Sequence, residues 1–224
     1  MDRGEIKLIY EDPKVLVCVK PSGILSTAQP GGLPELAEQQ LGLEPGKLRT
    51  VHRLDRATGG LMVLAKSRSA AAELSEQIRL GQTGKDYLAM VHGSTPEEGR
   101  MEDFMHRDKA RKMSFICSQE EPDSQQAILE FRRLWQGEGM SLVRVKLITG
   151  RTHQIRCQFA HRGFPLVGER KYSDRDDPCP LALFSCKLSF VMPGTHQPVS
   201  FSALPELCWP WSMAEDTLIN YEQS

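Results

Sequence analysis

Two short segments bring together side chains that can attack a carbon atom, move a proton or bind phosphate. The first, VHRLDRATGGL over residues 51–61, places the carboxylate of Asp55 between Arg53 and Arg56, directly before an apolar run. Nearby positive charge favours the ionised carboxylate, which suits a nucleophile better than a general acid. The spacing leaves one alternative open, in which Asp55 is an exposed turn residue in a surface salt bridge.

The second segment, ITGRTHQIR over residues 148–156, reads as a strand that runs through Thr-Gly straight into a helix. Unpaired backbone N–H groups and the positive end of the helix dipole would then lie beside Arg151 and His153. That geometry suits an RNA phosphate or a carboxylate. For Arg156, two interpretations stay open: the side chain turns inward beside Ile155 and pairs with a buried acid, or it lies on the surface of the helix.

An aromatic residue, Tyr87, follows Gly-Lys-Asp at the start of an apolar run. Aromatic rings at strand positions usually pack in the core. Taken alone, the position therefore favours a core ring over a functional one.

Apolar runs and turn residues predict the elements that must position these side chains. Strands are expected at 15–19, 61–65, 87–91, 113–117, 127–134, 141–148, 181–191 and 198–203. The first strand of the chain is expected to begin within about ten residues of Met1. Helices are expected at 33–41, at 69–80 with Ser69 as the N-cap, and at 152–162. Many strands without βαβ alternation predict an α+β fold around a central, mostly antiparallel sheet flanked by helices.

Length and composition predict one ordinary globular domain. The 224 residues are 40% hydrophobic and 25% charged, and they contain neither a long apolar run nor an apolar segment near Met1. The six cysteines include no C-x-x-C pair, so reduced thiols in the cytoplasm are expected, with no metal. We therefore expect a single domain over 1–224, with a core over about 9–205 and no membrane association.

Charge is segregated along the chain although the formal net charge is only −1. Three stretches are basic, with local net charges of +4 at 49–68, +3 at 107–112 and +6 at 144–171. Acidic residues gather instead near 97–103, 120–123 and 206–222. Such segregation can make one basic face on a neutral molecule, which is the electrostatic footprint of a polyanion-binding protein.

Four pieces of the sequence, in order, resemble the RluA-type RNA pseudouridine synthases. They are D-x-x-V-x-V-x-x-K-P-x-G at 12–23, H-R-L-D-x-x-T-x-G-L at 52–61, K-x-Y at 85–87, and ITGRTHQIR followed by HRGFPLVG at 148–168. The resemblance implies a basic cleft across the sheet and isomerisation of uridine to pseudouridine in structured rRNA or tRNA. It implies that the target base flips out of the RNA. It implies no cofactor and no metal. A monomer is expected.

By motif position, the resemblance assigns Asp55 as the nucleophile, Tyr87 as the ring that stacks on the target base, and Arg156 as the partner of Asp55. Arg53 matches a residue that helps hold the site vacated by the flipped nucleotide. The remaining residues expected to contact RNA are His52, Arg56, Lys85, Arg151 and His153. Whether Asp55 attacks C6 of the base or C1′ of the ribose, or assists loss of a ribose proton, stays open.

The sequence departs from the family pattern at three positions. Gly60 stands where a serine is usual in T-S-G, Glu169 replaces the aspartate of G-D, and Phe184 replaces the histidine of L-H-A. None of these is expected to touch Asp55, Tyr87 or Arg156. A separate S4-type RNA-binding domain is not expected, so substrate choice would come from the catalytic domain and RNA shape.

Two other classes of function compete with an isomerase. The first is an RNA-binding chaperone of the same fold without catalysis. The second is a nuclease that uses His52, His106 or His153 as acid and base, since histidine is the usual proton carrier near neutral pH.

Overall fold

The structure is a computed structural model that describes residues 5–222. These residues form two compact units. Unit 1 takes the described residues up to Lys85 together with Phe184–Leu204, and unit 2 takes Asp86–Leu183 together with the described residues from Pro205 onward. The sequence gives no signal for this division. A single catalytic domain over 1–224 stays a prediction, because packing into units does not test independent folding.

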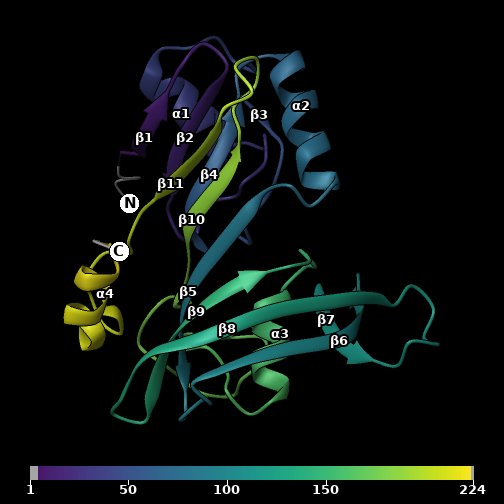
Figure 1. Cartoon of the computed structure of the whole chain (residues 1–224), viewed down its shortest axis with the longest axis vertical. Helices are drawn as coiled ribbons and strands as arrows, with labels where there is room; N and C mark the ends of the chain where they lie inside the picture. The colour runs from purple at the N-terminus through teal and green to yellow at the C-terminus, as the bar shows by residue number, and fades with distance from the viewer. Residues whose placement is uncertain (1–4, 223–224) are drawn as a thin grey trace. The chain divides into compact units, whose positions relative to one another are not determined.

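Unit 1 is built around a sheet with the strand order β1-β2-β4-β10-β11 (Figure 1). Its strands are β1 (Lys7–Glu11), β2 (Val15–Lys20), β3 (Arg49–Thr50), β4 (Gly59–Ala65), β10 (Leu183–Val191) and β11 (Pro198–Ser202). β4 and β10 run parallel, whereas β1–β2, β2–β4, β3–β4 and β10–β11 are antiparallel. β4 is buried along its whole length because its apolar residues pack on both faces of the sheet.

The helices of unit 1 begin and end on recognisable signals. α1 (Leu33–Leu41) has a proline in its first turn and ends at Gly42, whose φ of 62° lies in the left-handed region. α2 (Arg68–Arg79) packs against β3 and β4. Its N-cap is Ser67, whose side chain accepts from the backbone N–H of Ala70 at 3.1 Å, so the prediction of Ser69 as the cap is wrong by two residues.

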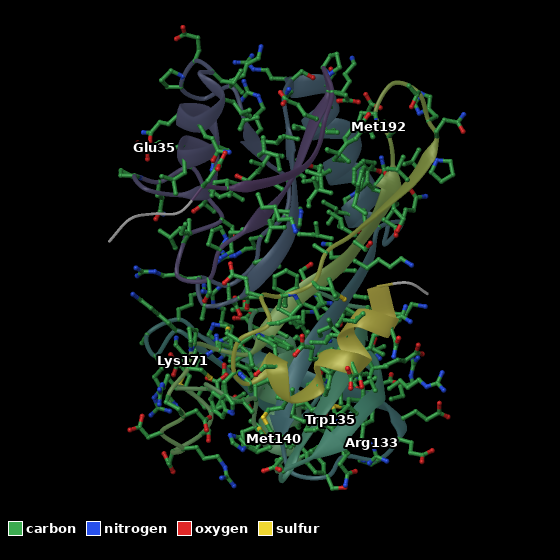
Figure 2. All side chains as sticks on the ribbon, turned by 90° about the vertical axis from the view of Figure 1, so that its left-hand side faces the viewer. Glu35, Arg133, Trp135, Met140, Lys171 and Met192 are labelled. Atoms are coloured by element: carbon green, nitrogen blue, oxygen red, sulfur yellow. The ribbon has the colours of Figure 1, made fainter. Side chains whose placement is uncertain are left out.

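Unit 2 contains an antiparallel sheet with the strand order β5-β9-β8-β6-β7 (Figure 1). Its strands are β5 (Gly84–His92), β6 (Glu98–Asp108), β7 (Met113–Cys117), β8 (Gln125–Gly137) and β9 (Met140–Leu147). The register of β8 and β9 shifts between Arg133 and Trp135. Figure 2 labels these two residues and Met140 at the turn end of the β8–β9 hairpin.

α3 (Gln154–His161) covers part of this sheet. Phe159 of α3 meets Phe131 of β8 edge to face, with ring centroids 5.3 Å apart. At the end of α3, the guanidinium of Arg162 pairs with both carboxylate oxygens of Asp103 on β6 at 2.9 and 3.0 Å. The acidic stretch near residue 100 is therefore a strand that anchors a helix.

The C-terminal segment adds a 3₁₀ turn, η1 (Trp211–Ala214), and α4 (Glu215–Glu222). Trp211 and Leu218 are buried, so the packed interior continues beyond residue 205. Among the described residues, no helix is long and apolar enough to cross a membrane. The predicted α+β class with a mostly antiparallel sheet is confirmed.

Candidate active-site residues

Asp55 lies on the loop that joins β3 to β4 in unit 1. Its side chain is half-buried, and its backbone carbonyl accepts a hydrogen bond from the N–H of Thr58 at 3.0 Å. This closes a turn immediately before β4, the fully buried strand. A carboxylate is therefore presented from a short loop directly attached to a rigid element, as a reacting group requires.

Lys20 holds this loop from inside the protein. The side chain is fully buried, and its ammonium donates to the carbonyl oxygens of Pro21 at 2.9 Å, Ile24 at 2.8 Å and Arg56 at 3.3 Å. Burial lowers the pKa of Lys20 to about 8, and the negative charge of Asp55 partly offsets that shift. One cation thus ties the loop after β2 to the residue that follows Asp55.

The segment after Lys20 supplies further hydrogen bonds to the loop. The hydroxyl of Ser26, which is buried, donates to the carbonyl of Leu54 at 2.6 Å and accepts from the N–H of Leu54 at 3.0 Å. Ser22 donates to the carbonyl of Ala57 at 2.7 Å. Reasoning from sequence missed Lys20 and Ser26 as site residues, although the K-P-x-G motif was the signal that marked this segment.

His52 and Lys85 of unit 1, both expected to contact RNA, lie in less polar surroundings than an RNA contact suggests. Nε2 of His52 accepts from the backbone N–H of Val63 at 3.1 Å, so the ring proton belongs on Nδ1. Burial first, and the charge of Lys85 second, lower the pKa of His52 to about 3. Burial also lowers the pKa of Lys85. His52 is therefore uncharged near neutral pH and brings no positive charge to a phosphate.

In unit 2, Arg156 turns inward and pairs with a buried acid, which confirms one of the two interpretations and makes the surface-helix alternative wrong. Its Nε and Nη2 donate to the two carboxylate oxygens of Glu169, each at 2.7 Å. The side chains are 6% and 0% exposed. Burial alone would raise the pKa of Glu169, but the hydrogen bonds and charge of Arg156 outweigh it, so the net shift is downward.

Tyr172 packs against the face of the same guanidinium, 5.6 Å from the ring centroid to Cζ of Arg156. Its hydroxyl accepts from the backbone N–H of Ser114 and lies 2.8 Å from Nδ1 of His153. The expectation that the three family departures avoid Arg156 is therefore wrong for Glu169. A carboxylate thirteen positions along the chain reaches Arg156 because the chain turns back after α3, and spacing does not reveal that turn.

The turn before α3 uses its backbone groups internally. The N–H of Arg151 donates to Oε1 of Gln154 at 2.9 Å, and the N–H of Gln154 donates to the carbonyl of Arg151 at 3.1 Å. His153 has a φ of 56°, in the left-handed region, which delays the start of the helix to Gln154. The expectation of unpaired N–H groups at this turn is thus wrong for these two.

Tyr87 lies on β5 opposite Val145 of β9, and its side chain is 7% exposed. On the same strand, the carboxylate of Asp86 accepts from Nη2 of Arg144 at 2.5 Å. Tyr87 is therefore held in a packed strand of unit 2, as its sequence position predicts.

The backbone at Gly60, the position assigned to the serine of the family pattern T-S-G, does not accept a side chain. Its φ is 117°, and a Cβ there would fall on the backbone nitrogen of Ser185 in the neighbouring strand β10. At Gly59, by contrast, a Cβ would meet Phe184 Cδ2 at 3.4 Å, which is an ordinary contact. Thr58, Gly59 and Gly60 correspond in order to T-S-G, so the departure belongs at Gly59 and the assignment to Gly60 is wrong.

Among residues 5–222, no group of three or more histidine, cysteine or acidic side chains is arranged to hold a metal ion. Three of the six cysteines, Cys18, Cys157 and Cys186, are buried thiols. Burial raises the pKa of Cys18 to about 12. These three thiols pack in the interior.

Comparison with known proteins gives one consistent result. Residues 14–161 match the family model described as RNA pseudouridylate synthase. The chain is 34% identical over 216 residues to an uncharacterized RNA pseudouridine synthase, YlyB, of Bacillus subtilis, covering 90% of this chain and 70% of that protein. It is 34% identical over 200 residues to the dual-specificity RNA pseudouridine synthase RluA of Vibrio vulnificus, covering 85% and 79%.

Solved structures show the same fold. Human RNA pseudouridylate synthase domain containing 1 superposes with a TM-score of 0.77 at 20% identity, over 100% of this chain and 98% of that one. Human RNA pseudouridylate synthase domain containing 4 gives a TM-score of 0.74 at 23% identity, over 95% and 93%.

Proposed function

The chain belongs to the RNA pseudouridylate synthase family, isomerases that convert uridine to pseudouridine in RNA, and we propose that it modifies specific uridines in structured rRNA or tRNA with Asp55 as nucleophile. The observation that carries the proposal is the support of the Asp55 loop by buried Lys20 and Ser26. A reacting carboxylate needs such a pre-arranged position.

The reaction requires that the N1–C1′ bond of a uridine break and that a C5–C1′ bond form. The proton on C5 leaves to solvent, and N1 takes up a proton, so the product has the mass of the substrate. A stacked base does not expose its glycosidic bond, and the target must therefore flip out of the RNA. Asp55 serves this exchange by adding to C6 or C1′ or by assisting loss of a ribose proton.

We assign supporting roles to the other residues expected from the motifs. Tyr87 stacks on the flipped base, and Arg156 acts as the charge partner of Asp55, which its rigid anchorage by Glu169 supports. Arg53 and Arg56 are exposed and available to RNA phosphates. His52, Lys85, Arg151 and His153 complete the proposed RNA contacts, with His52 acting as an uncharged group.

The names of two relatives support the proposed substrate class. One is called a dual-specificity RNA pseudouridine synthase, and another, from Borreliella burgdorferi, is called ribosomal large subunit pseudouridine synthase D. We therefore place the target uridine in rRNA or tRNA, and we propose that a monomer in the cytoplasm acts on it.

Mapping of pseudouridine in total RNA from a strain lacking the protein tests the proposal. We expect one or a few sites to lose pseudouridine and to regain it with the parent gene, but not with Asp55→Asn. Loss of no site, or recovery with Asp55→Asn, would contradict it. A chaperone would leave every nucleoside unchanged, and a nuclease would change chain length, so the same RNA separates all three classes of function.

A further inference from the structure

A hollow of about 350 Å³ opens on unit 2 between the β6–β7 strand pair and the turn before α3. Buried Met105 and Ser114 form part of its lining, together with Thr152. Three cationic side chains also line it: Arg107, Lys109 and Arg151. The residues come from a strand, a hairpin turn and the segment leading into a helix.

Hydrogen bonds join the two walls of this hollow. Arg107 lies opposite Ser114 in the β6–β7 pair, and the hydroxyl of Ser114 donates to the carbonyl of Thr152 at 2.7 Å. Arg107 Nη1 donates to Oγ1 of Thr152 at 3.4 Å, and Arg151 Nε donates to the carbonyl of Gln126 at 2.9 Å. These hydrogen bonds fix the orientation of the two guanidinium groups.

The hollow carries a net positive charge, because three cationic side chains and one carboxylate line it. Across the part of the chain that the structure describes, no carboxylate forms an ion pair with Arg107, Lys109 or Arg151, whereas Arg111 in the same hairpin pairs with Asp108 at 3.6 Å. Asp123 is the acidic residue in the lining. Clustered cations repel one another, and an anion that enters the hollow relieves that repulsion while gaining charge-assisted hydrogen bonds.

We propose that this hollow binds a phosphodiester of the RNA substrate, with Arg107 and Lys109 adding to Arg151, which the motifs already place among the RNA contacts. The inference rests on the proposed function, which makes RNA the substrate. Arg107 and Arg151 supply forked donors for phosphate oxygens, and Lys109 supplies a mobile point charge. The basic stretch at 107–112 thereby gains a role that the sequence motifs did not give it.

Salt-dependent binding tests the site without requiring turnover. A fluorescein-labelled RNA hairpin with a uridine in its loop is titrated by anisotropy against the parent, Arg107→Gln and Arg111→Gln. Both variants lose one positive charge from the β6–β7 hairpin, but only Arg107 lines the hollow. We expect Arg107→Gln to weaken binding several-fold and to reduce the slope of log K against log salt by about 1, with Arg111→Gln close to the parent.

Equal slopes for the two variants would overturn the proposal. Lys109→Gln provides a second variant if Arg107→Gln does not fold, because no hydrogen bond of its side chain joins other described residues. Titration with inorganic phosphate separates a site for free anions: phosphate binding that depends on Arg107, without a change in the RNA slope, also overturns the proposal. A smaller salt slope for Arg107→Gln, together with no isomerisation by the parent protein, would instead support the phosphate site and contradict the proposed function.

Discussion

At the scale of single residues, Arg156 and Glu169 form a two-point ion pair that water hardly reaches. Breaking a buried ion pair by removing one of its charges costs roughly 3–5 kcal/mol. We therefore expect Glu169→Gln to lower the free energy of unfolding by about that amount in a denaturant titration. Glu169 is the partner that a search by sequence spacing did not identify.

Glu76 provides the matched control for Glu169. It pairs with Arg79 at 2.5 Å on the exposed surface of α2, where water and salt screen the interaction. Glu76→Gln should therefore leave the free energy of unfolding nearly unchanged. Similar losses in the two variants would show that burial does not decide the strength of the Arg156 pair.

The lowered pKa of His52 leads to a prediction about stability in acid. Its pKa in the fold is about 3, below the ordinary value of 6.5, so the unfolded chain takes up a proton at a higher pH than the folded chain. The stabilising contribution of His52 is complete above pH 6.5 and is lost as the pH falls toward 3. We expect His52→Gln to make the free energy of unfolding fall less steeply across this interval.

The measurement is a series of urea titrations across that pH interval, with His196→Gln as the same replacement in an exposed turn. A pH dependence for His52→Gln that matches both the parent and the His196 variant would contradict the neutral state assigned to the half-buried ring.

Two substitutions of Tyr87 distinguish stacking by its ring from hydrogen bonding by its hydroxyl. Phenylalanine keeps the ring, whereas leucine removes the stacking surface, which is worth roughly 1–3 kcal/mol per base. Tyr87→Leu should therefore capture a flipped uridine much less well than Tyr87→Phe in stopped-flow fluorescence of a base-analogue RNA. Equal capture by both variants would leave Tyr87 as a core residue of β5 only.

At the scale of elements, the parallel contact between β4 and β10 depends on a glycine. A side chain at Gly60 would collide with the backbone of Ser185, and the φ of 117° is unfavourable for other residues. We expect Gly60→Ser to lower the melting temperature strongly and Gly59→Ser to change it little. Thermal unfolding followed by circular dichroism gives both values, and the reverse order would contradict the register of this strand pair.

Most elements could be predicted because their residues follow simple periods. The strand at 113–117 and the helix at 33–41 have the expected bounds. β6 was missed because Asp103 occupies an inward position between buried Met101 and Met105, which breaks the apolar alternation. That carboxylate is satisfied by Arg162 on α3, a tertiary contact that local sequence cannot indicate.

The site shows the same division between local and tertiary information. Asp55 and its loop could be located from the motif, but their support by Lys20 and Ser26 depends on contacts across more than twenty positions. The inward turn of Arg156 was one of two open interpretations, and its acid partner was not named. The sequence pattern shows which charged and polar residue types are present, whereas the tertiary fold determines which groups become their hydrogen-bond and charge partners.

At the scale of the whole molecule, a chain with a formal net charge of −1 carries strongly basic stretches. Many of its acids are used in pairs with arginines, such as Asp103 with Arg162, while no ion pair within residues 5–222 involves the cations around the unit 2 hollow. Local charge therefore decides whether this protein attracts RNA, and the net charge does not.

We propose that Asp55 performs the chemistry and does not merely bind RNA. Release of tritium from C5 of labelled uridine in RNA measures isomerisation directly, and anisotropy with the same RNA measures binding. We predict that Asp55→Asn releases no detectable tritium while its RNA affinity stays within a few-fold of the parent, because phosphate contacts dominate affinity. Tritium release by Asp55→Asn at a rate comparable to the parent would contradict the account.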